Sequence, residues 1–141
     1  MIDAPALPLP LPFPYFERDE TTMTEQIESL MKANLHEVFG QRDPALRRAA
    51  IERTYTEDVV FLDPDEVVEG WDALDAKAGA LLEGAPGFVF SEAGSIYVNH
   101  DMGYLAWNLG PEGQPPVVRG VDSCFIRDGR IAKVYTLLLK D

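Results

Sequence analysis

The second half of the chain alternates apolar and polar residues in short runs. From residue 88 onward, each run is rich in β-branched and aromatic side chains and is bounded by Gly, Asn, Asp or Pro. This pattern is typical of β-strands, because successive side chains point to opposite faces of a sheet. The sequence therefore predicts strands at residues 88–90, 96–98, 104–109, 117–126 and 131–139.

The first half has apolar residues at helical spacing instead. A capping-box pattern at Thr22–Glu25 opens an apolar stripe that continues to about residue 39. Asp43 followed by Pro44 predicts the start of a second helix, which extends to about residue 55. A third helix is expected at residues 71–82, after a glycine.

A short strand at residues 58–63, stopped by Pro64, separates the second and third helices. Helices first and a meander of strands afterwards predict an α+β fold, a curved, mainly antiparallel sheet with three N-terminal helices on its concave face. Residues 1–21 are rich in proline and are expected to form an appended arm, because alternating Pro cannot make a ladder of hydrogen bonds. The folded domain is then residues 22–141.

One polar residue interrupts the apolar face of a predicted strand. The strand positions that share a face with it carry Val, Gly, Cys and Ile, and Asp122 lies at their centre. Such a carboxyl is solvated, paired, or kept neutral by a raised pKa. Asn34 similarly interrupts the stripe of the first helix, four residues from Leu30 and Val38. Its amide is either satisfied by backbone in the core or faces a cavity.

Composition excludes several functional classes. At 141 residues the chain fits one domain, and its formal charge of −12 opposes binding to nucleic acid. No apolar run approaches the ~20 residues that span a membrane. The single Cys124 excludes an internal disulfide and suits the cytoplasm, and two histidines make a structural zinc site improbable. We expect neither a metal nor a cofactor.

The helices, the strand ending Phe61-Leu62-Asp63-Pro64 and the final hairpin together resemble the nuclear transport factor 2-like superfamily. The hairpin begins Gly120-Val121-Asp122 and turns at Asp128-Gly129. The nearest pattern is that of the SnoaL-like polyketide cyclase and ketosteroid isomerase group, over about residues 24–139. The resemblance implies a cone-shaped fold with an apolar pocket between helices and sheet, and a homodimer packed through the sheet.

The resemblance also implies roles for individual residues. Asp63 matches the general base of the isomerases, and Asp122 matches the carboxyl that stays protonated and donates to the enolate oxygen. Cyclases of the group similarly place an acid/base Asp at the position of Asp122. The chain departs from the isomerase pattern at Asn34, which replaces the tyrosine of the oxyanion hole, whereas Tyr55 keeps a supporting tyrosine.

Two carboxyls from separate elements that meet in one apolar pocket suit acid/base chemistry, since one can be ionised and the other neutral. We expect Asp63 to be ionised and Asp122 to have a raised pKa. The predicted activity is proton transfer next to a carbonyl, as in an isomerase, cyclase or dehydratase. The alternative is a non-catalytic protein that binds a small hydrophobic ligand, with Asp122 in a structural role.

The ligand is expected to be a small hydrophobic molecule that carries a carbonyl. The residues expected to bind it, besides the two carboxyls, are Asn34, Tyr55, Phe61, Trp107, Met31, Val134 and Leu138. The opposite face of the last strands is too apolar for open water and is the expected dimer surface. Its residues are Val117, Val121, Phe125, Tyr135 and Leu137.

Overall fold

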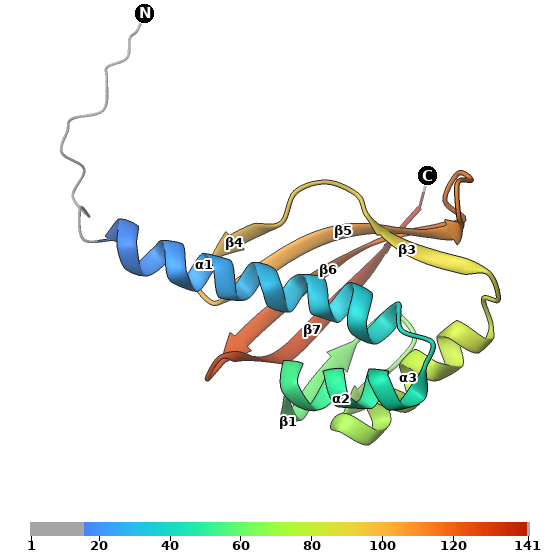
Figure 1. Ribbon diagram of the computed structural model, residues 1–141, viewed down its shortest axis with the longest axis horizontal. Coiled ribbons are helices and arrows are strands. Elements are labelled where there is room, and N and C mark those ends of the chain that lie inside the picture. Colours follow the sequence, from blue (N-terminus) through green and yellow to red (C-terminus); the bar gives the residue numbers. More distant parts are fainter. Residues whose placement is uncertain (1–15, 141) are drawn as a thin grey trace, which may run out of the picture.

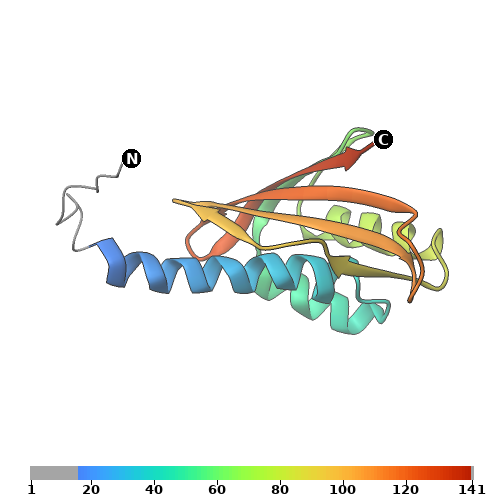
Figure 2. The same ribbon diagram turned by 90° about the horizontal axis from the view of Figure 1, so that it is seen from above.

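A computed structural model describes residues 16–140. They form helices packed against one side of a curved sheet (Figures 1 and 2). The elements in order are α1 (Phe16–Lys32), the π-helical segment η1 (Ala33–Phe39), α2 (Pro44–Thr54), β1 (Tyr55–Leu62), β2 (Val67–Glu69), α3 (Trp71–Glu83), β3 (Phe88–Glu92), β4 (Tyr97–Asn99), β5 (Met102–Pro111), β6 (Val118–Arg127) and β7 (Arg130–Leu139).

The described strands form one seven-stranded sheet in the order β2-β1-β7-β6-β5-β3, with β4 also paired to β5. All pairs are antiparallel except β1 with β7, so the sheet is mixed but mainly antiparallel. In Figure 2 α1 runs lengthwise beneath the strands, and α2 lies on the same side. The predicted α+β class is confirmed. None of the helices in residues 16–140 is long and apolar enough to cross a membrane.

The register of β5, β6 and β7 places the inward-facing side chains in rows. Leu105, Asp122 and Thr136 form one row, because β6 pairs with both neighbours at Asp122. The adjacent row toward the β6–β7 turn is Gly103, Cys124 and Val134. Asp122 is thus in the middle strand of three, and β-sheet lies on both sides of it.

The ends of the elements follow local sequence signals. Asp43 caps α2 by accepting hydrogen bonds from the amides of Ala45 and Leu46, at 2.9 and 3.0 Å, and Pro44 occupies the first helical position, as predicted. The Asp128-Gly129 turn has positive φ at both residues, 54° and 79°. Such φ values are those of the tight hairpin turn that the sequence predicts.

Three local expectations differ from the structure. Helix α1 begins at Phe16, before the capping box, because no proline lies between residues 16 and 22 and this stretch includes the good helix formers Glu17, Arg18 and Glu20. The predicted arm therefore overlaps α1 over residues 16–21, and its first fifteen residues lie outside the described part. Strand β2 was not predicted, because three residues are too few to show a period. It pairs with β1.

The end of the first helix is the third difference. Residues Ala33–Phe39 form a π-helical segment, in which each turn holds more residues than an α-helical turn. Ala33, Asn34 and Leu35 are consecutive and all buried. The wider turn therefore brings Asn34 and Leu35 to the sheet together.

Candidate active site

A cavity of about 290 Å³ opens between the helices and the sheet. Its walls come from η1 and α3 on one side and from β1, β3, β5, β6 and β7 on the other. Most of the lining is apolar, and the polar groups are few. The lining residues are Leu35, Phe39, Phe61, Asp63, Asp65, Lys77, Leu81, Phe90, Trp107, Leu109, Val118, Asp122, Thr136 and Leu138.

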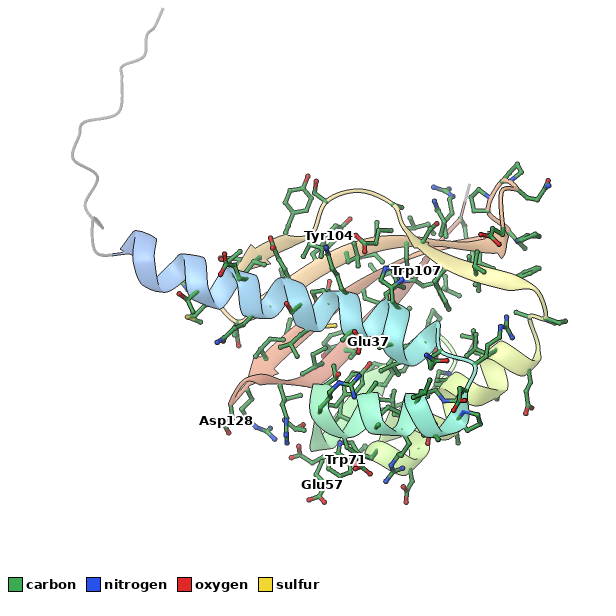
Figure 3. The ribbon with its side chains drawn as sticks, in the orientation of Figure 1. Glu37, Glu57, Trp71, Tyr104, Trp107 and Asp128 are labelled. Atoms are coloured by element: carbon green, nitrogen blue, oxygen red, sulfur yellow. The ribbon has the colours of Figure 1, made fainter. Side chains whose placement is uncertain are left out.

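Asp122 is the buried polar group of this cavity, with 5% of its surface exposed. Its Oδ1 accepts hydrogen bonds from Trp107 Nε1 at 3.1 Å and Thr136 Oγ1 at 2.7 Å. Its Oδ2 accepts one from Asn34 Nδ2 at 2.8 Å. Trp107, labelled in Figure 3, belongs to β5, so three separate elements besides β6 hold the carboxyl.

Asn34 is itself held from behind. The Tyr55 hydroxyl donates to Asn34 Oδ1 at 2.5 Å, and both residues are almost fully buried. Because Oδ1 is occupied by a donor, the amide must present its NH₂ group to Asp122. Tyr55 thus fixes the orientation of the amide that binds the carboxyl.

Burial raises the pKa of Asp122, and the hydrogen bonds from Thr136, Trp107 and Asn34 oppose it without cancelling it. Its pKa therefore lies above the ordinary value. Burial also raises the pKa of Tyr55 and of Cys124 far above their usual ranges. Tyr55 consequently stays a neutral hydroxyl that can donate, and Cys124 stays a neutral thiol in the core.

A second polar cluster lies where α3 meets the end of β1. Lys77 Nζ of α3 is 2.7 Å from Asp63 Oδ2 and 2.8 Å from Glu66 Oε2. Asp63 Oδ1 accepts hydrogen bonds from the backbone amides of Asp65 and Glu66, at 2.9 and 3.0 Å. Lys77 and Asp63 expose only 13% and 15% of their side chains, so the pair is largely buried.

The pKa of Asp63 shifts in the other direction. Burial acts to raise it, but the hydrogen bonds from Lys77 and from the two amides lower it by more, so its pKa is below the ordinary value. The pKa of Lys77 is raised, since its bonds to Asp63 and Glu66 outweigh the effect of burial. Both directions favour a charged pair. The expected contrast between an ionised Asp63 and an Asp122 of raised pKa agrees with these shifts.

The sheet register separates the two carboxyls. Leu62 of β1 pairs with Tyr135 of β7, so Asp63 follows beside Thr136, and Asp122 of β6 pairs with Thr136 from the other side. Two strand spacings, about 10 Å, therefore lie between the two backbones. Asp63 and Asp122 line one cavity from different positions along its wall and share no hydrogen bond among those described.

The structure sorts the ligand-binding residues expected from sequence into two groups. Phe61, Trp107 and Leu138 line the cavity with the two carboxyls. Asn34 and Tyr55 lie behind Asp122 and reach the cavity only through it.

Met31 and Val134 lie deeper still. Both are fully buried in the core and are absent from the cavity lining. Val134 belongs to the next row of the sheet, and Met31 packs so closely on Gly103 that a Cβ there would lie 2.6 Å from its sulfur. Side chains fill that end of the cone, and they leave no room for a ligand.

Three polar lining residues, Thr136, Lys77 and Asp65, are absent from the sequence-based expectations, and the spacing of apolar residues could have found the first two. Thr136 lies two residues from both Val134 and Leu138 on β7, so strand alternation places it on their face. Lys77 lies three residues after Leu74 and four before Leu81, which places it on their helical stripe. Both signals were present in the pattern.

No group of three or more His, Cys, Asp or Glu side chains in the described part of the chain is arranged to hold a metal ion. The polar groups of the cavity are thus three carboxyls, an ammonium, a hydroxyl and the ring N–H of Trp107. Together these groups can donate hydrogen bonds, accept them and exchange a proton.

A family model described as the SnoaL-like domain matches residues 33–134. The chain belongs to the SnoaL-like family. The matched SnoaL-like segment includes Asn34, Asp63, Lys77 and Asp122 and ends before Thr136. The family resemblance drawn from the sequence is therefore confirmed. None of the curated proteins compared with the chain matches it.

Solved structures share the fold of this SnoaL-like chain. One is a suggested isomerase of the SnoaL-like family from Agrobacterium tumefaciens. It is 23% identical to this chain with a TM-score of 0.76, and the match covers 82% of this chain and 99% of that one. A suggested SnoaL-like polyketide cyclase from Jannaschia has 19% identity and a TM-score of 0.65, covering 82% and 85%. A suggested ketosteroid isomerase from Kribbella flavida has 17% identity and a TM-score of 0.64, covering 83% and 80%.

Proposed function

We propose that the cavity is the active site of an enzyme that moves a proton next to a carbonyl group, with Asp122 as the group that takes and returns the proton. One observation carries the proposal: a carboxyl of raised pKa, 5% exposed, is held at a fixed position in the wall of an otherwise mainly apolar cavity. A carboxyl in such surroundings is a stronger base than an exposed one, and its acid form persists closer to neutral pH.

The proposed reaction has two steps that share this carboxyl. The Asp122 carboxylate first removes a proton from the carbon beside the substrate carbonyl, which leaves an enolate and a neutral carboxyl. The carboxyl then gives the proton to another carbon in an isomerisation, to a departing hydroxide in a dehydration, or to the alkoxide formed when the enolate carbon attacks a second carbonyl in a cyclisation. Asp122 ends each sequence ionised, as it began.

Asp63 has a different role in this proposal. Its two oxygens already accept hydrogen bonds from Lys77 and from two backbone amides, and its pKa is lowered. These bonds stabilise the anion and make it a weaker base than Asp122. We therefore assign it the positioning of Lys77 at the cavity wall, in place of the general-base role that the isomerase resemblance implies.

A second candidate function is ligand binding without catalysis. The observation that favours it is that Asp122 already accepts three hydrogen bonds, from Asn34, Trp107 and Thr136. A carboxyl held by three donors is also a good structural element that links β5, β6, β7 and η1. The two candidate functions predict different results when the negative charge of Asp122 is removed.

The deciding experiment is Asp122→Asn, which keeps the shape of the side chain. Uptake of deuterium at the α-carbon of small aryl methyl ketones in heavy water, followed by proton NMR, measures proton abstraction without knowledge of the natural substrate. We expect wild-type protein to catalyse the exchange and Asp122→Asn to lower its rate by roughly 10²-fold or more. Ketone affinity should change little, because the cavity walls remain.

The control is Asp63→Asn, which also removes one cavity carboxylate. Under this proposal it affects exchange less than Asp122→Asn does. Equal exchange rates for wild type and Asp122→Asn would contradict the catalytic role. Wild-type protein that binds the ketones but does not accelerate exchange would favour the binding protein.

A further inference from the structure

Lys77 gives the cavity a second polar end. Its ammonium has three N–H groups, of which two point to Asp63 and Glu66. Nζ lies 5.7 Å from the centroid of the Phe61 ring, and both side chains line the cavity. The ammonium therefore borders the ligand space while the two carboxylates hold it in place.

The charges around Lys77 select against anions. Asp63 and Glu66 are bonded to its ammonium, and Asp65 lines the same cavity, so the carboxylates at this end outnumber the one ammonium. Asp122 is the third carboxyl of the cavity lining, after Asp63 and Asp65. A ligand carboxylate would lose its hydration and meet this negative charge, whereas a neutral oxygen would meet only the N–H donor.

The size of the cavity limits the ligand further. Its volume, about 290 Å³, is at the lower end of the ~300–1,000 Å³ typical of ligand sites. Asp63, which positions Lys77, and Asp122 are two strands apart, about 10 Å between backbones. A molecule the size of one substituted ring can place one oxygen near each end.

We propose that the ligand is a small uncharged molecule with two oxygen functions joined by a carbon framework. Its reacting carbonyl reaches Asp122, which rests on the function proposed above, and a hydroxyl or second carbonyl accepts a hydrogen bond from Lys77. Lys77 is thus a specificity-determining residue, and the walls between the two ends contact only carbon.

Two ketones of the same shape test this assignment. The probe para-(hydroxymethyl)acetophenone carries a hydroxyl where para-ethylacetophenone carries a methyl group, so the two differ only in the group that would meet Lys77. Dissociation constants are measured by calorimetry for wild type and Lys77→Met. We expect the preference for the hydroxyl ketone over the ethyl ketone to fall about tenfold in Lys77→Met, the effect of losing one hydrogen bond to a charged donor.

Two further variants control for indirect effects. Lys77→Met leaves Asp63 without its ion-pair partner, so the double variant Lys77→Met/Asp63→Asn removes both charges and should show the same loss of preference. Lys133→Met removes an exposed lysine of β7 and should leave the preference unchanged. A change in both Lys77 variants but not in Lys133→Met locates the effect at the cavity.

Charged analogues provide the other half of the test. We expect para-acetylbenzoate to bind wild type more weakly than the hydroxyl ketone, because its carboxylate meets the negative charge of the cavity. We expect the same of para-(aminomethyl)acetophenone, because its ammonium would face the Lys77 ammonium and cannot accept a hydrogen bond from it. Tighter binding of the carboxylate or of the amine, no measurable binding of the hydroxyl ketone, or a preference unaffected by Lys77→Met would each overturn the inference. The dissociation constants report ligand binding alone, whereas the deuterium-exchange rates report proton transfer. The inference about Lys77 can therefore fail while Asp122→Asn still lowers the exchange rate. The proposal for Asp122 can likewise fail while Lys77→Met still changes the preference between the two ketones.

Discussion

At the scale of single residues, opposing effects set the pKa of Asp122. Burial raises it, and the donors Thr136, Trp107 and Asn34 lower it. The contribution of Asn34 depends on Tyr55, whose hydroxyl occupies the amide oxygen and turns the NH₂ group toward the carboxyl. Tyr55 therefore affects the pKa of Asp122, the group that we propose to be catalytic, although Tyr55 itself does not line the cavity.

Tyr55→Phe tests this dependence. Without the hydroxyl, Asn34 Oδ1 is buried without a donor, and the amide can turn to accept a hydrogen bond from protonated Asp122. The ionised carboxyl loses a fixed donor and the neutral form gains an acceptor, so we expect the pKa of Asp122 to rise further. Tyr135→Phe, at an exposed tyrosine of β7, should leave it unchanged.

The titration can be read from Trp107, because its ring N–H is bonded to the carboxyl. Trp71 is the other tryptophan of the sequence, so fluorescence against pH is measured in a Trp71→Phe background. Asp122→Asn should abolish the acid transition. Tyr55 and Cys124 have strongly raised pKa values and do not titrate in that range. An unchanged midpoint in Tyr55→Phe would show that Tyr55 does not orient the amide.

At the scale of elements, β5 and β6 approach each other at a glycine. The Trp107 ring of β5 lies over Gly120 of β6, where an added Cβ would be 2.2 Å from its Cζ2 atom. Gly120 thus makes room for the indole. The Nε1 atom of Trp107 then reaches Asp122, which lies two residues after Gly120 on β6. Phe90 of β3 packs against the indole edge-on, with ring centroids 5.3 Å apart.

We expect Gly120→Ala to displace the Trp107 ring. Overpacking of this kind costs about 1–3 kcal/mol in the free energy of unfolding, and the displaced ring would no longer donate to Asp122. Denaturant unfolding measures the cost. Gly84→Ala is the matched control, since the nearest atom to its added Cβ is 3.6 Å away, an ordinary contact. Equal stability of the two variants would show that the indole shifts without penalty.

At the scale of the whole molecule, the outer face of the sheet is exposed and apolar. Val117, Tyr135 and Leu137 expose 63%, 42% and 60% of their surface, whereas Val121 is buried among its neighbours. An exposed apolar surface on a sheet favours association with another protein surface. A homodimer through this face stays our prediction.

Sedimentation at micromolar concentration checks this prediction. We expect a dimer for the wild type and a monomer for Leu137→Asp, because a charge at this surface would lose its hydration in the interface. Leu46→Asp, at an exposed leucine of α2, is the control that should stay dimeric. Because each copy carries a formal charge of −12, added salt should strengthen the dimer by screening the repulsion. Wild-type protein that sediments as a monomer both without and with added salt would contradict the prediction.

The sequence by itself determined the class of the fold and the positions of the two carboxyls. Strand alternation placed Asp122 on the inner face of β6, and the pattern before Pro64 placed Asp63 at the end of β1. Caps and turns, such as Asp43 and Asp128-Gly129, also depend on neighbouring residues alone. These features were predictable because backbone periodicity and capping are local.

Which polar groups meet depends on contacts between distant parts of the chain. Asn34 bonds to Asp122 across 88 positions of sequence, and Lys77 rather than solvent neutralises Asp63. The same applies to Met31, which fills the core although it shares an apolar stripe with residues nearer the cavity. Such contacts depend on the sheet register, on the wider turn of η1 and on how closely α1 packs on β5. These features are set by packing between elements that are distant in the sequence.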